Sequence, residues 1–273
     1  MNKKNILITG CSSGIGYDTA HYLHANGYKV YATARKSEDV ERLKSEGLDA
    51  YKLDVCSESD ISNMLNIIIE QDSELFAVFN NAGYGQPGAV EDITTEVLRE
   101  QFETNLFGLH ELTYQTLKIM RKQGYGRILQ HSSVLGIISL RFRGAYNASK
   151  YAIEGLCDTL RLELMDTNIY VSTINTGPVH SDFRKNAIIK FKENVDVENS
   201  SYKSLYDTEL LSVKEKDDDM FTKKSSVVIK NILDALEAKK PKPRYYNTFA
   251  THLLGSLKRV LTTSALDKIL IKI

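Results

Sequence analysis

Tyr146 and Lys150 carry a phenol and an ammonium group four residues apart. The surrounding pattern predicts that a helix begins near Tyr146, and this spacing would place both groups on one face of it. A phenol titrates near pH ~10 in water, so it transfers protons at neutral pH only beside a positive charge that favours the phenolate. Lys150 is placed to supply that charge, and the pair therefore indicates proton transfer to or from an oxygen atom.

Tyr114 and Lys118 have the same spacing, so spacing alone does not identify a site. The apolar residues around Tyr114 favour an ordinary amphipathic helix that carries a solvated lysine. Ser133 lies 13 residues before Tyr146, just after an apolar run, whereas the same offset from Tyr114 falls on Gln101 in a polar helix. The presence of Ser133 distinguishes the Tyr146 pair from the Tyr114 pair.

Short apolar runs alternate with helix-length amphipathic stretches along the whole chain. The expected strands are 5–9, 29–34, 50–53, 76–80, 127–130 and 169–175, with another near 244–246. The expected helices are 15–25, 39–45, 59–71, 95–122, 146–166 and 225–239. This alternation is typical of α/β proteins with a doubly wound parallel sheet. We therefore expect one Rossmann-type domain over residues 1–273, with about seven strands flanked by helices.

A glycine-rich segment follows the first expected strand and leads directly into the first expected helix. It consists of Thr9, Gly10, Cys11, Ser12, Ser13, Gly14, Ile15 and Gly16. The glycines would permit a tight turn and the close approach of a pyrophosphate, which the start of the helix would face. A turn that only links strand to helix is the alternative for the segment alone. Its position at the head of the βαβ series favours dinucleotide binding.

The composition limits the classes of partner. Thirty-five basic and thirty-five acidic residues leave this chain of 273 residues with no net charge, which argues against nucleic acid. Cys11, Cys56 and Cys157 are odd in number and lack any CxxC pairing, so we expect a reducing compartment and no metal site. Because no apolar run approaches the ~18 residues of a membrane span, we expect a cytoplasmic protein.

The glycine spacing, together with Ser133 and the Tyr146 pair, resembles the short-chain dehydrogenase/reductase family in its single-domain branch. Further motifs stand in the order that this family has them: Leu53-Asp54-Val55, Asn80-Asn81-Ala82-Gly83, Asn105 and Gly177-Pro178-Val179. The resemblance covers nearly everything from residue 5 to about residue 246. Within the family the chain looks most like bacterial NADP-dependent aldehyde reductases and the retinol and 17β-hydroxysteroid dehydrogenases.

The resemblance implies a role for each matching residue. Tyr146 would be the general acid or base, and Ser133 would hydrogen-bond the same substrate oxygen. Lys150 would hold the nicotinamide ribose and lower the Tyr146 pKa, while Asn105 would hold a water that links Lys150 to a proton relay. Ser133 capping a strand end, and Asn105 bonding its own backbone, are the alternatives. The implied cofactor-binding residues are Gly10, Ser12, Ser13, Gly14, Ile15, Gly16, Asp54, Val55, Asn81, Ala82, Gly83, Tyr146, Lys150, Gly177, Pro178, Val179 and Ser181.

The charge at the end of the second strand favours NADP(H) over NAD(H). An acid there would accept the 2′-hydroxyl of NAD, but Ala34 stands at that position and Arg35 and Lys36 follow it. A guanidinium matches a phosphate well, and Ser12 and Ser13 could add hydroxyl donors. The alternative is that Arg35 and Lys36 only solvate a loop.

The sequence departs from the family beside the nicotinamide, where Thr176 replaces the usual proline and Ser181 replaces a threonine. Residues 180–222 form the expected substrate lid. Its apolar residues are Phe183, Ile188, Ile189, Phe191, Tyr202, Leu205, Tyr206, Leu210 and Leu211. An apolar underside would suit an apolar aldehyde or ketone, and ordinary helix packing is the alternative.

Residues 249–273 form an apolar and basic tail, for which we expect docking against protein, with membrane contact and a subunit interface as alternatives. The family also implies a homodimer or homotetramer built on helices 95–122 and 146–166. The expected function is NADP(H)-dependent interconversion of a small apolar carbonyl compound and its alcohol. A non-catalytic NADP-binding redox sensor or scaffold is the alternative, disfavoured by the complete set of four site residues. An isomerase or dehydratase of the two-domain relatives is disfavoured by the glycine spacing.

Overall fold

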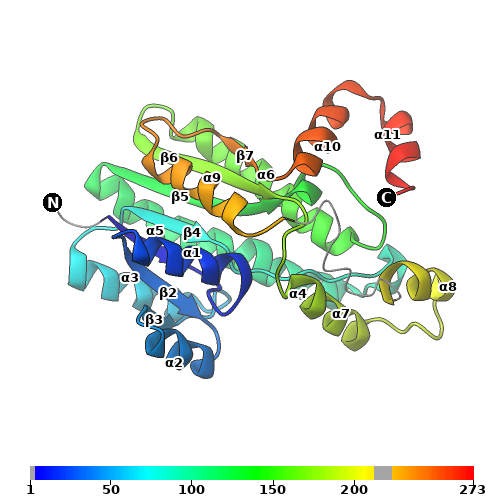
Figure 1. Cartoon of the computed structure of the whole chain (residues 1–273), viewed down its shortest axis with the longest axis horizontal. Coiled ribbons are helices and arrows are strands. Elements are labelled where there is room, and N and C mark those ends of the chain that lie inside the picture. Colours follow the sequence, from blue (N-terminus) through cyan, green and yellow to red (C-terminus); the bar gives the residue numbers. More distant parts are fainter. Residues whose placement is uncertain (1–3, 212–222) are drawn as a thin grey trace.

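The computed structural model describes residues 4–211 and 223–273, and its centre is a seven-stranded sheet (Figure 1). The strands are β1 (Asn5–Ile8), β2 (Lys29–Ala34), β3 (Asp49–Lys52), β4 (Ala77–Asn80), β5 (Tyr125–Ser133), β6 (Asn168–Thr176) and β7 (Arg244–Tyr246). Their order in the sheet is β3-β2-β1-β4-β5-β6-β7, and every neighbouring pair is parallel. The predicted α/β fold with a doubly wound parallel sheet is therefore confirmed.

Helices cover both faces of the sheet. The α-helices are α1 (Gly14–Ala25), α2 (Ser37–Ser45), α3 (Glu58–Asp72), α4 (Thr95–Phe102), α5 (Leu109–Gln123), α6 (Gly144–Glu163), α7 (Phe183–Asn194), α8 (Lys203–Tyr206), α9 (Ser226–Glu237), α10 (Phe249–Val260) and α11 (Thr263–Leu270). The short elements are η1 (Val90–Asp92), η2 (Glu103–Gly108), η3 (Val134–Gly136) and η4 (Asp207–Leu211). One core cluster joins α1, α2 and α9 to the sheet, and a second joins α3, α5 and α6 to its other face.

The central strands read as continuous apolar runs because both of their faces are buried. All four residues of β1 are buried, and the same holds for β4. Ile6 and Ile8 pack in the cluster with α1 and α9, whereas Leu7 between them packs in the cluster with α3, α5 and α6. This alternation follows from the two-residue period of a strand, and it fixes the register of β1 between the two helical layers.

The turn after β3 is held by the start of α3. Ser57 caps that helix by accepting a hydrogen bond from Asp60 N at 3.2 Å. Asp60 in turn accepts from Asp54 N at 3.0 Å. The backbone at Asp54, where the family resemblance predicts adenine contacts, is thereby fixed from the helix that follows it.

The stretch predicted as one helix over residues 95–122 is continuous but not uniform. α4 runs into a π-helical segment, η2, which runs into α5. A side chain at Gly108, the last residue of η2, would place its Cβ 2.4 Å from the Val55 carbonyl oxygen. The widened turn carries Asn105, and π-helical segments are frequent at functional sites.

The tail packs against protein in this structure. Leu266 of α11 is buried with Val134 and Ile138 in the loop after β5, and Leu254 and Leu257 of α10 join the same cluster. Within the described part of the chain, no helix is both long enough and apolar enough to cross a bilayer.

Candidate active site

Loops from the carboxyl ends of the strands surround the point where the strand order reverses, between β1 and β4. Open α/β sheets bind their ligands at such a point. The glycine-rich segment of residues 9–16, here called the glycine loop, follows β1 and leads into α1. Arg35 and Lys36 follow β2, and Asp54 and Val55 follow β3. Ser133 is the last residue of β5. The other predicted site residues come from the glycine loop or from the segments that follow β4, β5 and β6.

The glycine loop leaves no room for side chains at two of its glycines. Gly10 has φ +71°, and a Cβ there would lie 2.9 Å from Ala82 Cα. A Cβ at Gly16 would lie 2.4 Å from both Asn81 Nδ2 and the Gly10 carbonyl oxygen. Gly14 also has a positive φ, +59°, which L residues rarely adopt. The loop is partly exposed at Gly10, Ser12, Ser13 and Gly14, and its backbone forms a cradle at the start of α1, where the end of a helix favours an anion such as a pyrophosphate.

The loop after β4 locks the glycine loop in place. Thr9 Oγ1 accepts hydrogen bonds from Asn81 N at 3.0 Å and Ala82 N at 2.9 Å. Asn81 Nδ2 donates back to the carbonyl oxygens of Thr9 at 2.9 Å and Gly10 at 3.1 Å. Gly83, next in the chain, faces Asn105, because a Cβ there would lie 3.0 Å from Asn105 Oδ1.

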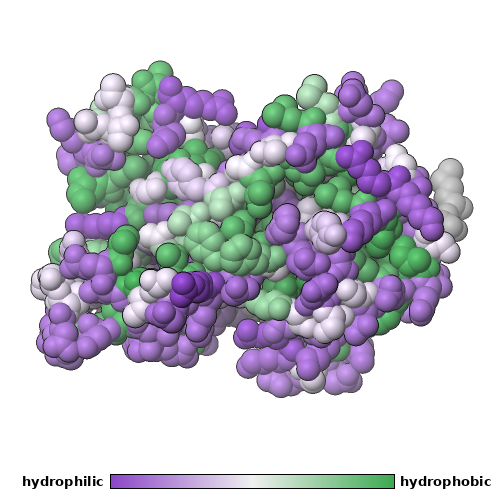
Figure 2. All heavy atoms as spheres, turned by 180° about the vertical axis from the view of Figure 1, so that it is seen from behind, coloured by the Kyte–Doolittle hydropathy of each residue, from purple (hydrophilic) through white to green (hydrophobic). Residues whose placement is uncertain are grey.

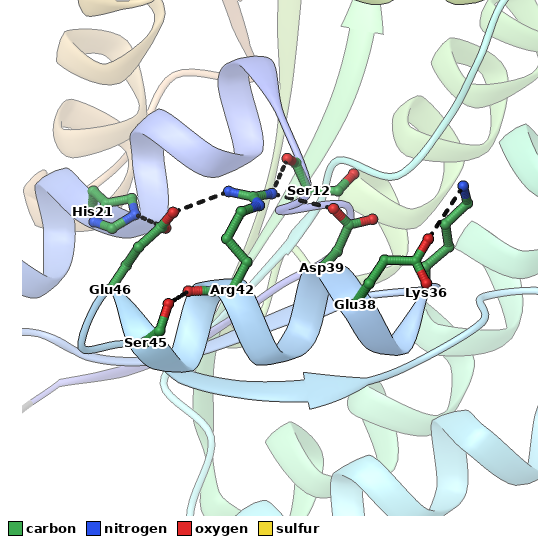
Figure 3. Close-up of polar contacts among 8 residues, drawn as sticks. All are labelled: Ser12, His21, Lys36, Glu38, Asp39, Arg42, Ser45 and Glu46. Carbon is green, nitrogen blue, oxygen red and sulfur yellow. Dashed lines mark hydrogen bonds and ion pairs between the residues drawn. The ribbon is translucent and has the colours of Figure 1, made fainter.

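Arg42 of α2 holds the other side of the glycine loop, and our sequence reasoning missed it. Its Nη2 donates to the Ser12 carbonyl oxygen at 2.6 Å (Figure 3). Asp39 and Glu46 each pair with the guanidinium at 3.2 Å, and the Tyr17 ring lies under it at 5.3 Å. The helical spacing of Asp39, Arg42 and Glu46 signals the ion pairs, but nothing in it signals the contact with Ser12.

Arg35 and Lys36 stand exposed after β2. Lys36 pairs with Glu38 at 3.6 Å on the surface (Figure 3), and Arg35 forms no ion pair with any residue that the structure describes. The guanidinium of Arg35 is therefore available to an anionic ligand. Ala34, at the predicted position of the discriminating acid, is buried at the end of β2.

Four predicted residues are buried together beneath this edge: Asn105, Ser133, Tyr146 and Lys150 are 1%, 7%, 9% and 6% exposed. Lys150 Nζ lies 5.6 Å from the centroid of the Tyr146 ring and donates to the His131 carbonyl oxygen at 2.7 Å. By contrast, Tyr114 is 49% exposed, and Lys118 Nζ lies 3.9 Å from its ring centroid on the surface of α5. Only the Tyr146 pair is enclosed by the fold.

The electrostatics differ from the sequence-based expectation. Burial raises the pKa of Tyr146 to about 12, although the Ser133 hydroxyl favours the phenolate. Burial also lowers the pKa of Lys150 to about 8, against the attraction of the Glu154 carboxylate. In the protein alone, desolvation of the phenolate therefore outweighs any lowering of the Tyr146 pKa by Lys150.

Ser133 and Asn105 bond to neighbouring segments. The Ser133 hydroxyl accepts from Leu135 N at 3.1 Å, so it caps η3, and it donates to the Thr176 carbonyl oxygen at 3.3 Å. Asn105 bonds to the backbone of Tyr84 at 3.1 Å and 2.9 Å and donates to the Ser149 hydroxyl at 3.2 Å. The capping alternative for Ser133 is thus present in the structure, whereas Asn105 reaches across to the loop after β4.

The segment after β6 lies directly over the glycine loop. A Cβ at Gly14 would lie 3.1 Å from Ser181 Cβ, and one at Gly177 would lie 2.2 Å from Thr248 Oγ1. The Pro178 carbonyl oxygen accepts a hydrogen bond from Lys223 N at 3.1 Å, and Val179 forms an isolated β-bridge with Lys223. Lys223 begins the second described part of the chain. These contacts place the predicted nicotinamide residues beside the cradle.

Phe183 is the lid residue that meets the site. Its ring centroid lies 5.3 Å from the ring centroid of Tyr146. A Cβ at Gly85 would lie 2.8 Å from Phe183 Cζ. Most other apolar lid residues pack in a cluster of their own around Phe142 rather than lining the site; its members include Phe191, Tyr202, Leu205, Tyr206 and Leu210. The packing alternative thus applies to them, while residues 212–222 and the side chain of Leu211 lie outside the described residues. In the described chain, no three His, Cys, Asp or Glu side chains gather to hold a metal ion.

The match to known sequences identifies the family. The family model of the short chain dehydrogenases matches residues 4–190. The chain belongs to this family. An uncharacterized oxidoreductase of Escherichia coli strain K12, YbbO, is 38% identical over 269 residues, 98% of this chain and 94% of that protein. A 3-ketodihydrosphingosine reductase of Bacteroides thetaiotaomicron is 34% identical over 208 residues, 75% and 76% of the two chains. This short-chain dehydrogenase is accordingly an oxidoreductase.

Solved structures share the fold of this short-chain dehydrogenase but hold different cofactors. A variant of the actinorhodin polyketide ketoreductase with NADPH has a TM-score of 0.72 and 26% identity, over 89% of this chain and 94% of that chain. A short chain dehydrogenase/reductase from Burkholderia phymatum in complex with NAD has a TM-score of 0.77 and 21% identity, over 95% and 92%. The fold alone does not choose between the two cofactors.

Proposed function

We propose that this chain is an NADP(H)-dependent oxidoreductase that interconverts an aldehyde or ketone with its alcohol by hydride transfer. The observation that carries the proposal is the burial of Ser133, Tyr146, Lys150 and Asn105 together, next to a glycine cradle that a dinucleotide fits. Burying a lysine ammonium and a tyrosine hydroxyl costs desolvation free energy, and buried titratable groups with shifted pKa values cluster at functional sites.

In this proposal Ser133 and Tyr146 bind the carbonyl oxygen, and the Tyr146 hydroxyl donates its proton to that oxygen during reduction. Bound NADPH would supply the hydride that the carbonyl carbon accepts. Lys150 would hold the nicotinamide ribose and favour the phenolate that the proton transfer leaves. Asn105 would hold the water through which the proton is replaced. For alcohol oxidation each proton moves in the opposite direction.

The cofactor would lie with its pyrophosphate on the glycine loop and its adenine beside Asp54 and Val55. The exposed guanidinium of Arg35 supports NADP(H), because it could pair with the 2′-phosphate in two hydrogen bonds. Arg42 would support this end of the site indirectly by holding the Ser12 carbonyl oxygen. The NADPH complex of the ketoreductase agrees with this choice, and the NAD complex shows that the fold tolerates the other.

The substrate would be a small apolar carbonyl compound. Support comes from Phe183, whose aromatic ring stands against Tyr146 where the body of a substrate would lie. The Bacteroides relative is named as a reductase of 3-ketodihydrosphingosine, which is compatible with a ketone as the substrate. In this proposal residues 1–273 form a single domain of a cytoplasmic protein. Phe183 is the lid residue that would lie against the bound substrate.

A homodimer or homotetramer through α5 and α6 completes the proposal. Tyr114 on α5 and Leu156 and Leu162 on α6 are exposed. Figure 2 shows hydrophobic patches among polar residues on the face turned away in Figure 1, one of them near the middle of the view. Burying apolar surface in a subunit interface would contribute about 25 cal/mol for each Å² of apolar area. Membrane contact through the exposed apolar residues of the tail stays a prediction.

The test is a screen of NADPH oxidation over aldehydes, ketosteroids and quinones, run in parallel with NADH. We expect turnover with NADPH on apolar carbonyl compounds and a loss of at least 10³-fold in a Tyr146→Phe variant, which lacks only the phenol hydroxyl; the loss is an order-of-magnitude figure for a general acid. A Tyr114→Phe variant is the matched control and should keep full activity. Full turnover in the Tyr146→Phe enzyme would refute the assigned role.

A further inference from the structure

His131 lies on β5, two residues before Ser133, and joins the two loops that flank the proposed nicotinamide site. Its Nδ1 lies 2.9 Å from Asn81 Oδ1, in the loop after β4. Its Nε2 lies 3.1 Å from Thr176 Oγ1, at the end of β6. The imidazole therefore bridges the strands on both sides of β5 at the edge where the cofactor would bind.

The direction of each hydrogen bond follows from the other contacts of the partners. Asn81 Nδ2 donates to two backbone oxygens of the glycine loop, which leaves its Oδ1 to accept from His131 Nδ1–H. His131 Nε2 then carries a lone pair and accepts the hydroxyl proton of Thr176. Asn247 Nδ2 lies 3.4 Å from Thr176 Oγ1 and donates to it. One neutral tautomer of His131 satisfies the whole chain of bonds.

The backbone of His131 is joined to the site as well. Its carbonyl oxygen accepts from Lys150 Nζ at 2.7 Å. Burial, together with the nearby ammonium, lowers the pKa of His131 to about 3, so the ring stays neutral at any working pH. A neutral ring is what Thr176 requires, because an imidazolium has no lone pair to offer.

Thr176 is the last residue of β6, and the predicted nicotinamide-binding residues follow it directly. Its hydroxyl is held by His131 and Asn247, and its carbonyl oxygen accepts from the Ser133 hydroxyl at 3.3 Å. The side chains of His131, Asn247 and Ser133 thus restrain Thr176, which directly precedes the residues predicted to bind the nicotinamide.

We propose that His131 is a positioning residue that fixes Thr176 and Asn81 on either side of the proposed cofactor site. The proposal rests on the proposed function only in assigning NADP(H) to this site. A ring that lies behind the site would act through Asn81, Thr176 and Lys150, without contacting substrate.

A double-mutant cycle on NADPH binding tests this role, with affinity measured by the fluorescence of the bound nucleotide in the full chain. We expect His131→Leu to weaken binding by about tenfold, the typical effect of losing a buried hydrogen-bond network, and Thr176→Val by a few-fold. Because both changes break the same network, the double variant should bind no more weakly than His131→Leu alone. His131→Gln should recover part of the loss, since its amide oxygen can accept from Thr176.

Thr116→Val is the matched control, because the Thr116 hydroxyl is buried and has no hydrogen-bond partner in the described structure. It should leave NADPH affinity unchanged. Effects of His131→Leu and Thr176→Val that multiply in the double variant would overturn the coupling. Unchanged affinity in both folded single variants would overturn the positioning role itself.

The nitrogen NMR spectrum of labelled histidine in the wild-type protein tests the same network directly, because it reports which ring nitrogen carries the proton. The signal of His131, identified by its absence in His131→Gln, should show Nδ1 protonated and Nε2 unprotonated from pH 5 to pH 9. The opposite tautomer, or titration within that range, would overturn the proposal. A chain that binds NADPH but reduces no carbonyl compound would refute the proposed function and leave these readouts valid.

Discussion

Replacing Lys150 with methionine isolates the free-energy cost of keeping an ammonium group beneath the active-site edge. Burial lowers the pKa of Lys150 from its ordinary 10.5 to about 8, so the unfolded chain binds this proton more tightly than the folded one. Below pH 8 the group is charged in both states, and the folded protein bears the full cost. As the pH rises from 8 to 10.5 the folded state releases the proton first, and the cost disappears. At ~1.4 kcal/mol per pH unit the whole effect is about 3 kcal/mol.

The assay is urea unfolding of the cofactor-free wild type and Lys150→Met at pH 7.0 and pH 9.5. Relative to the variant, the wild type should gain about 2 kcal/mol in free energy of unfolding between these two values. The comparison removes the contributions of other titrating groups, which both proteins share. A difference between the two proteins that does not change with pH would refute the argument, because it would mean that Lys150 keeps an ordinary pKa in the folded state.

Two further substitutions test the cofactor cradle. Gly16→Ala should lower the free energy of unfolding by about 1–3 kcal/mol in thermal or urea unfolding, because its Cβ would lie 2.4 Å from Asn81 Nδ2 and Gly10 O. Gly155→Ala on α6, where a Cβ meets nothing within 4 Å, should instead stabilise the protein slightly, and equal effects would contradict this account. Arg35→Glu should weaken NADPH binding by about tenfold or more while sparing NADH, as a lost charge-assisted pair would; an equal loss for both nucleotides would contradict the 2′-phosphate assignment.

The sequence predicts the sheet well because its signals are local. A parallel strand buried on both faces is a short apolar run, and the helices between such runs are amphipathic. The strand expected at residues 29–34 has those bounds in the structure, and the short strand β7 lies at residues 244–246, where one is expected. β5 and β6 extend on both sides of the predicted 127–130 and 169–175, because the chain pairs further than its apolar run. β1 and β4 are each one residue shorter than predicted, and β3 is shifted by one residue.

The parts that the sequence does not predict depend on contacts between distant segments. His131 meets Asn81 and Thr176, which lie 50 and 45 residues away, and Arg42 meets Ser12 across 30 residues. No periodicity signals such pairs. The π-helical turn at Asn105 also depends on a distant contact. The local sequence is compatible with a regular helix, and the end of the turn at Gly108 packs against the backbone of Val55. In the same way, the desolvation of Tyr146 depends on what covers it and not on its spacing from Lys150.

The raised pKa of Tyr146 keeps its hydroxyl protonated in the cofactor-free protein, which is the form that the proposed reduction requires. At neutral pH a phenol whose pKa is about 12 is fully protonated, so it is ready to donate a proton to a carbonyl oxygen. Oxidation of an alcohol requires the phenolate, which the protein alone disfavours by burial. The oxidised nicotinamide carries a positive charge that the reduced form lacks, and beside Lys150 it would favour the phenolate. The same tyrosine can therefore be an acid when the reduced cofactor is bound and a base when the oxidised cofactor is bound, without any change in the protein.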